Sequence, residues 1–166
     1  MTAQIPLVGG NYYHIYNRGN NGETIFRTEE EQKTWQLAAS CQVSPGWQPC
    51  PPSRAFKNLF IAYSMAFNTR YERTGSLFQK PFKRRLVDSD HYFAALVRYI
   101  HRNPEKHGLI PDFREWPWSS YEAILAERPT RILRDDVLAW FGGRAPFIAL
   151  HQTDPDERSI AHFIIE

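Results

Sequence analysis

The segment from Cys41 to Pro52 constrains the fold more than any other part of the chain. Its sequence, CQVSPGWQPCPP, holds four prolines and a glycine. Proline fixes φ and has no amide N–H, so this run excludes both a continuous helix and a central strand. We therefore expect a Pro-rich linker over 41–52, which separates an N-terminal strand and helix from everything that follows.

Composition and charge limit the class of protein. The 166 residues are 42% hydrophobic and 14% aromatic, which suits a folded domain with a core rather than a disordered tail. No apolar run approaches the roughly 18 to 20 residues needed to cross a bilayer, and the first residues lack a signal-peptide pattern, so we expect a cytoplasmic protein. Cys41 and Cys50 have no CxxC spacing, so neither a zinc site nor a redox motif is predicted.

Periodic patterns predict the elements on both sides of the linker. Aromatic and apolar residues alternate over 11–17, which predicts a strand closed by a turn. Thr28 precedes three glutamates, a pattern typical of a helix N-cap, and this helix should run to about Ser40. After the linker, Ser53 is the predicted N-cap of an amphipathic helix that should end near Tyr71.

The second half of the chain predicts one more strand and several helices. Alternation over 76–87 indicates a strand, which Pro81 places at an edge or a bulge. The run 88–90 caps a helix that should end at Asn103, because the residue before a proline avoids helical geometry. Its expected buried stripe is Phe93, Leu96, Val97 and Ile100. Short helices are predicted around 121–125, 135–141 and 146–151, the last two separated by a pair of glycines.

Positive charge gathers in the middle of the sequence. Between residues 54 and 85 there are eight basic residues and one acid. On a strand, Lys83 and Arg85 would share one face, while Arg84 would lie on the Phe82 side. Cations interleaved with aromatic residues favour contact with a nucleic-acid backbone combined with base stacking. The alternative is a strand face that is merely solvated.

Four blocks together suggest a family. They are 13–21 (YHIYNRGNN), 73–84 (RTGSLFQKPFKR), 99–108 (YIHRNPEKHG) and 116–121 (WPWSSY). In this order they resemble the REP-associated tyrosine transposases, which are single-tyrosine HUH transposases. The resemblance implies an α+β, ferredoxin-like domain, with an antiparallel sheet and helices on one face. It also implies binding of single-stranded or hairpin DNA, and cutting and rejoining of one strand through a 5′-phosphotyrosine.

The resemblance also assigns roles to individual residues. Tyr99 matches the catalytic tyrosine, and Asn103, one helical turn later, matches a ligand of a divalent metal, magnesium or manganese. A tyrosine hydroxyl is a weak nucleophile at neutral pH, so the metal and the tyrosine are needed together. Taken alone, Tyr99 is a packed helix tyrosine and Asn103 a helix-end residue. The expected DNA contacts are His14, Arg18, Lys80, Lys83, Arg84 and Arg85.

One part of the family pattern is missing. The family carries its metal-binding His-x-His pair on a strand at the place that the linker occupies here, and the six histidines of this chain form no such pair. We expect a sheet reduced by loss of its central strands, in a DNA-binding domain over 1–128 followed by a helical extension over 129–166. Exposed sheet edges would favour a homodimer.

Two functions remain open for such a chain. One is a transposase-type enzyme, impaired by the loss of the histidine pair, and the other is a non-catalytic DNA-binding remnant or regulator. A decayed reading frame without a retained function is a third possibility.

Overall fold

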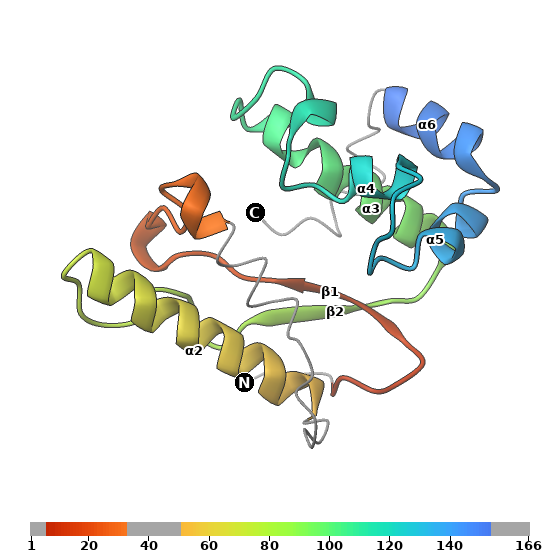
Figure 1. Cartoon of the computed structure of the whole chain (residues 1–166). Helices are drawn as coiled ribbons and strands as arrows, with labels where there is room; N and C mark the ends of the chain where they lie inside the picture. The colour runs from red at the N-terminus through yellow and green to blue at the C-terminus, as the bar shows by residue number, and fades with distance from the viewer. Residues whose placement is uncertain (1–5, 33–50, 154–166) are drawn as a thin grey trace. The chain divides into compact units, whose positions relative to one another are not determined.

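The chain folds into a mixed helix-and-sheet structure (Figure 1). The computed structural model describes residues 6–32 and 51–153. The elements are β1 (Tyr12–Tyr16), the 3-10 turn η1 (Asn20–Gly22), α2 (Pro52–Arg70), β2 (Lys83–Val87), α3 (Asp90–Lys106), the 3-10 turn η2 (Phe113–Glu115), α4 (Tyr121–Leu125), α5 (Arg134–Trp140) and α6 (Arg144–Gln152). Within these residues, no helix has the length and apolar character that a membrane span requires.

Contacts along the chain divide it into two compact units, Met1–Leu86 and Val87–Glu166. The α+β class is confirmed. The described sheet consists of β1 and β2, paired antiparallel, so the ferredoxin-like arrangement stays a prediction.

The sheet of the first unit is shorter than the sequence pattern suggests. β1 matches its predicted strand, but β2 begins only at Lys83, so the prediction of one strand over 76–87 was too long. Pro81 lies just before β2, and because it has no N–H it cannot donate to the ladder. Ahead of it, Phe78 forms an isolated antiparallel bridge with Gly19. The turn after β1 is thereby held against the segment that leads into β2.

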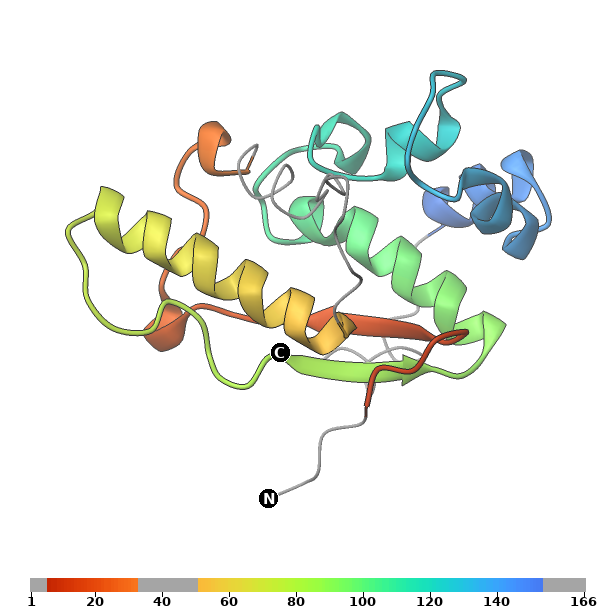
Figure 2. The ribbon, with the colours of Figure 1, turned by 60° about the horizontal axis from the view of Figure 1, so that its bottom comes forward.

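Helix α2 supplies the core of the first unit. It begins at Pro52, with Pro51 as its N-cap, because a proline at the first helical position has no N–H that a helix would use. The prediction of Ser53 as the N-cap was therefore wrong, and Pro52 belongs to the helix rather than to the linker. Tyr63 and Phe67 on its inner face are buried together with Leu77 and Phe78. The Tyr63 hydroxyl donates to the Ile25 carbonyl over 2.8 Å. Figure 2 shows α2 lying along the two strands.

The predicted N-cap at Thr28 is confirmed. The Thr28 Oγ1 accepts from the Glu31 N–H over 3.3 Å, and the Glu31 carboxylate accepts from the Thr28 N–H over 3.2 Å. This reciprocal pair is a capping box, which satisfies amide groups that the first helical turn leaves without partners. The rest of the helix predicted to Ser40, and residues 41–50 of the predicted linker, lie outside the described residues.

Helix α3 starts where the sequence predicts and ends later. The Ser89 Oγ accepts from the Tyr92 N–H over 3.3 Å, as an N-cap does. The predicted end at Asn103 was wrong, because the helix runs through Pro104 to Lys106. Near a helix end the missing proline N–H removes only one hydrogen bond, and the final turn is still closed by the His107 N–H on the Asn103 carbonyl.

The buried face of α3 also differs from the predicted stripe. Leu96 is buried as expected, but Ile100 is 50% exposed. Tyr92 and His101 are buried instead. The buried face is therefore partly polar, and it involves a histidine that apolar periodicity does not mark.

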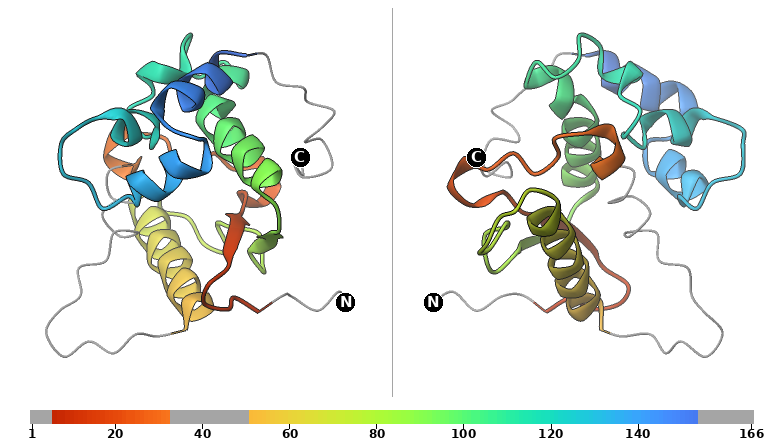
Figure 3. Two further views of the ribbon diagram at one scale, coloured as in Figure 1. Left: turned by 90° about the vertical axis from the view of Figure 1, so that its right-hand side faces the viewer. Right: turned by 60° about the vertical axis from the view of Figure 1, so that its left-hand side comes forward.

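The second unit has a core of its own. Figure 3 shows the ribbon of α3 and of the elements that follow it. Its buried members are Phe113, Tyr121, Ile124 and Phe147. The predicted short helices correspond to α4, α5 and α6. Half-buried residues of α5 and α6 pack on the same core. The described part of 129–166 is therefore built into the second unit, and a separate domain over 1–128 stays a prediction.

Candidate nucleic-acid interface

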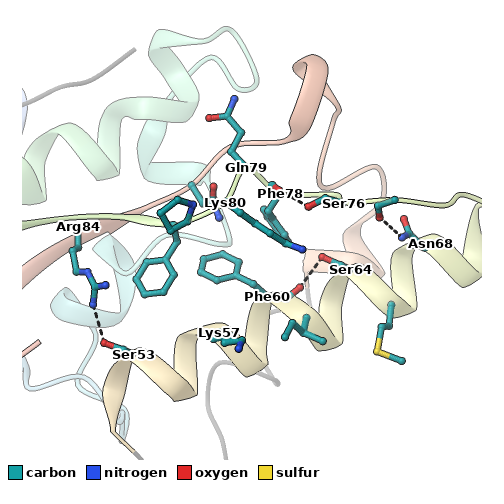
Figure 4. Close-up of a pocket in the computed structure, with 16 residues that line it drawn as sticks. Ser53, Lys57, Phe60, Ser64, Asn68, Ser76, Phe78, Gln79, Lys80 and Arg84 are labelled. Atoms are coloured by element: carbon teal, nitrogen blue, oxygen red, sulfur yellow. Dashed lines mark hydrogen bonds between the residues drawn. The ribbon is translucent and has the colours of Figure 1, made fainter. Parts of the chain in front are cut away.

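A pocket of about 770 Å³ opens in the first unit between α2 and the segment from Gly75 to Arg84 (Figure 4). Both walls follow from the sequence, because α2 is amphipathic and the bridge between Gly19 and Phe78 holds the opposite segment in place. None of the sixteen lining residues is an acid. The pocket is therefore apolar at its base and carries only positive charge.

Three cationic side chains line this pocket. The Arg84 guanidinium donates to the Ser53 hydroxyl over 2.8 Å and lies 5.0 Å from the centre of the Phe82 ring. The prediction that Arg84 lies on the Phe82 side of the strand is thus confirmed. Lys57 on α2 and Lys80 before β2 are exposed. Figure 4 shows the Lys80 side chain extending across the pocket toward α2.

Phenylalanine rings form the apolar part of the pocket. The Phe60 ring centre lies 5.5 Å from that of Phe82, and it meets Phe78 edge-on at 4.9 Å. Phe78 is 4% exposed and belongs to the core. Phe60 and Phe82 are half-buried. Such rings can stack on a flat aromatic group.

Most polar groups of the pocket are engaged with the protein. The Ser64 hydroxyl donates to the Phe60 carbonyl over 2.7 Å, and the Ser76 hydroxyl donates to the Phe78 carbonyl over 2.7 Å. The Asn68 amide nitrogen donates to the Gly75 carbonyl over 2.8 Å. These donors are therefore committed to the backbone.

Ion pairs in the first unit gather elsewhere. Glu23 pairs with Arg27 and Arg73, and Glu30 pairs with Arg70. Within the described residues Lys57, Lys80 and Lys83 form no ion pair. The positive charge of these three lysines is therefore not neutralised by an ion pair within residues 6–32 and 51–153.

The structure brings Arg18 beside the pocket segment. Arg18 is exposed, and its carbonyl accepts from the Gln79 N–H over 3.0 Å, one residue before Lys80. Gly19 next to it is buried, and a Cβ there would lie 2.2 Å from the Glu23 carbonyl oxygen. The turn therefore requires glycine for a close backbone approach, whatever Arg18 contacts.

His14 interacts electrostatically with Arg85 rather than with the pocket. Burial, and then the nearby Arg85 charge, lower the pKa of His14 below the ordinary value for histidine. Its ring lies 4.8 Å from Tyr16, and its Nδ1 is buried without a hydrogen-bond partner among the described residues. The lowered pKa disfavours the charged form of His14.

Tyr99 and Asn103 both lie on α3, in the second unit, and both are half-buried. The Asn103 carbonyl accepts from the His107 N–H over 3.0 Å, an ordinary helical hydrogen bond that holds Asn103 within α3. Across residues 6–32 and 51–153 no three His, Cys, Asp or Glu side chains converge on a point that could hold a metal. The described residues therefore do not fit the expected divalent ion, and we derive no step through it.

A buried hydrogen-bond chain close to Tyr99 in sequence was not predicted. The His151 Nδ1 lies 2.8 Å from the Phe147 carbonyl, which can only accept, so this nitrogen carries the proton. The His151 Nε2 then accepts from the His101 Nδ1 over 2.9 Å. The remaining nitrogen of His101 accepts from the Ser120 hydroxyl over 2.7 Å. The network joins α3, α4 and α6, from positions 19 and 50 residues apart in sequence that no local pattern could connect.

The electrostatics of this chain of hydrogen bonds favour a structural role. Burial, followed by the nearby His151, lowers the pKa of His101 to about 3. Serine followed by two histidines is an order that can activate a nucleophile, but a base of such low pKa removes a proton poorly at neutral pH. We therefore assign Ser120, His101 and His151 to fixing α3 against its neighbours.

Comparison with known proteins found one relative whose sequence matches part of this chain. A stretch of 54 residues is 33% identical to a Haemophilus influenzae protein named "Putative REP-associated tyrosine transposase". That stretch is 32% of this chain and 31% of the relative. The chain thus matches about a third of the length of that curated relative. No family model matches the chain, and no solved structure matches it.

Proposed function

We propose that this protein binds single-stranded or hairpin DNA through the basic side of its first unit. One observation carries the proposal: Lys57, Lys80 and Lys83 form no ion pair within the described residues, and two of them line an acid-free aromatic pocket. Cations without internal partners are free to neutralise phosphates, which supply most of the affinity for nucleic acid. The aromatic pocket favours unpaired strands, whose bases can leave the stack.

The family resemblance supports the same proposal. Residues 13–21 and 73–84 are two of the blocks that resemble REP-associated tyrosine transposases, and they meet at the bridge between Gly19 and Phe78. The Haemophilus influenzae relative carries that family's name. We propose that this chain also binds hairpin or single-stranded DNA, as the resemblance implies.

Salt-dependent binding tests the proposal. Affinity of the purified protein for a labelled DNA hairpin would be measured by fluorescence anisotropy at several salt concentrations, for wild type, Lys80→Gln, Lys83→Gln and Arg128→Gln. Removing one phosphate contact should make the negative slope of log affinity against log salt shallower, by about 0.7 for a contact to a single strand and about 0.9 for a contact to the duplex stem. Arg128, exposed in the second unit and paired with Glu122, is the matched removal of one charge and should change nothing.

The outcome that contradicts the proposal is specific. Binding that is absent in wild type, or weakened equally by Arg128→Gln and Lys80→Gln, would show that the first unit provides no DNA interface.

Strand cleavage is the second candidate, and it rests on the resemblance of Tyr99 and Asn103 to a catalytic tyrosine and a metal ligand. In such a reaction the tyrosine oxygen bonds to the 5′-phosphate and releases a 3′-hydroxyl. We expect hairpin binding without cleavage, because the sequence contains no His-x-His pair. Incubation of wild type and Tyr99→Phe with hairpin DNA and magnesium or manganese decides this point. A covalent adduct that Tyr99→Phe abolishes would establish the enzyme instead.

A further inference from the structure

We propose that Asn21 is a site of spontaneous deamidation, which converts its neutral side-chain amide into a carboxylate and thereby weakens the binding of DNA. The chemical change is independent of the proposed function, whereas its effect on DNA rests on that function. Asn21 lies in the turn η1, and of the seven asparagines in the chain it is the one that a glycine follows.

The reaction needs only the protein and water. The Gly22 backbone nitrogen loses its proton and bonds to the Asn21 Cγ, and the side-chain nitrogen leaves as ammonia. Water then breaks one of the two carbonyl–nitrogen bonds of the resulting five-membered imide. Breaking either bond restores an open chain, with aspartate or isoaspartate at position 21. Each product carries one new negative charge.

The attacking nitrogen is accessible in this turn. Glycine has no Cβ, so no side chain on residue 22 hinders the approach of its nitrogen to Cγ. The turn is closed by the next amide, because the Glu23 N–H donates to the Asn20 carbonyl over 2.9 Å. The Gly22 N–H itself makes no hydrogen bond with any described residue. Both Asn21 and Gly22 are exposed, so water reaches the imide.

The Asn21 side chain can also reach the attacking nitrogen. It forms no hydrogen bond within residues 6–32 and 51–153 that would have to break first. Asn21 has a φ of 54°, in the left-handed region that asparagine tolerates better than most residues. The N–Cα bond lies outside the imide ring, so this φ does not oppose ring closure.

The other asparagines lack this combination of features. The Asn20 Nδ2 donates to the Ser76 carbonyl over 2.9 Å, so its amide is held away from the backbone that follows it. The Asn17 Oδ1 accepts from the Arg18 N–H over 2.9 Å, which engages the nitrogen that would have to attack. The remaining four are followed by tyrosine, by an amide within α2 or by a proline: Asn11, Asn58, Asn68 and Asn103.

The turn that carries Asn21 is joined to the proposed DNA-binding segment. The Asn20 N–H donates to the Leu77 carbonyl over 2.9 Å, next to the bridge between Gly19 and Phe78. Arg18, an expected DNA contact, precedes Asn21 by three residues. A carboxylate at position 21 therefore lowers the positive charge of this side of the first unit and repels phosphates.

The first part of the experiment measures the modification without DNA. Wild type and Asn21→Gly are incubated for several days at mildly alkaline pH and then digested with trypsin, which cleaves after Arg18 and Arg27. One peptide then contains both Asn20 and Asn21, so tandem mass spectrometry compares the two in the same molecule. Asn21 should convert to aspartate and isoaspartate while Asn20 keeps its amide. An unchanged Asn21, or equal conversion of Asn20, would overturn the site.

The second part measures the affinity for a labelled DNA hairpin by fluorescence anisotropy. Glycine tolerates a positive φ, so Asn21→Gly should fold and bind like fresh wild type. Asn21→Asp, which carries the charge of the product, should bind about threefold more weakly at low salt. Incubated wild type should lose affinity in proportion to its conversion, whereas incubated Asn21→Gly should lose none.

Each contrary result in the second part has its own meaning. Unchanged affinity of Asn21→Asp, or equal losses in incubated wild type and incubated Asn21→Gly, would overturn the effect of deamidation on DNA binding. Fresh wild type that binds no hairpin would overturn the proposed function, and the mass spectra would still decide whether Asn21 is the site of deamidation.

Discussion

At the scale of single residues, the least expected feature is a pair of neutral imidazoles inside the second unit. His101 and His151 are almost completely buried, and they share one hydrogen bond. Burial opposes the charged form of each ring and lowers the pKa of both. Burial, rather than a shortage of acceptors, opposes an added proton, because the Ser120 hydroxyl can turn to accept from the His101 Nε2.

The free energy of unfolding should therefore fall in mild acid. The unfolded value for histidine is 6.5, and the pKa of folded His101 is about 3. The contribution of neutral His101 to the free energy of unfolding is complete above pH 6.5. It is lost as the pH falls from there toward 3, because in this range only the unfolded state takes up the proton. The loss for this group is about 1.4 kcal/mol per pH unit. Denaturant unfolding at pH 7 and pH 5 measures it.

The variant His101→Gln isolates this effect from that of other buried histidines. It should be less stable at pH 7, yet lose less stability than wild type between pH 7 and pH 5. Equal losses in both proteins would show that His101 titrates normally. The lower limit of pH 5 avoids most of the titration of Glu105, whose pKa is lowered from 4.5 by the Phe113 N–H and by Arg102.

A second residue-scale prediction concerns Gly19. Its substitution by alanine would drive a Cβ into the Glu23 carbonyl, so the turn after β1 must shift. We expect Gly19→Ala to lower the unfolding free energy by about 2 kcal/mol. Gly9→Ala is the matched control, because nothing lies within 4 Å of a Cβ there. Equal denaturant midpoints for the two variants would contradict the close approach.

At the scale of elements, the sequence predicted those features that depend only on nearby residues. The N-caps at Thr28 and Ser89 and the amphipathic helix α2 depend on neighbours within a few residues, and they were predicted close to their positions. The end of α3 was not, because one missing hydrogen bond at Pro104 did not stop a helix whose last turn is otherwise satisfied.

The candidate site was likewise predicted only where nearby residues determine it. Lys80, Arg84 and Phe82 were readable as part of an interleaved run over 76–87. Lys57 and Phe60 were not predicted for the site, because they lie on α2. The pocket itself was not, because it needs α2 opposite that run, and the pairing of distant segments leaves no local pattern in a sequence. Ser120 and His101 were missed for the same reason.

The cap of α3 allows an element-scale prediction. Ser89→Ala removes the acceptor of the Tyr92 N–H and should lower the unfolding free energy by about 1 kcal/mol. Ser89→Asp keeps an acceptor at that position and should restore stability. Thermal unfolding of the three proteins measures both effects, and an unstable aspartate variant would argue against capping.

At the scale of the whole molecule, the two units are supported by different kinds of interaction. The first combines an aromatic core with ion pairs around Glu23, while Lys57, Lys80 and Lys83 form no ion pair with any described residue. The second combines an aromatic core with buried imidazoles. DNA contact is proposed for the first, and the residues resembling a catalytic centre lie in the second.

Truncation tests how far the second unit depends on its C-terminal helices. A chain ending at residue 128 lacks α5 and α6, including Phe147, which is 0% exposed, and His151, the partner of His101. We expect residues 87–128 of the shortened chain to lose protection from limited proteolysis. Protection equal to that of the full chain would support a domain over 1–128 that folds without the extension.

The shared hydrogen bond between His101 and His151 also limits how this sequence can evolve. Replacing one imidazole alone leaves the other buried with an unmatched nitrogen, whereas exchanging both for apolar side chains of similar volume leaves none. A lineage that replaces the two histidines one at a time therefore passes through a less stable protein with a single buried histidine. Positions 101 and 151 should therefore be inherited together, with both histidines present in a relative or neither.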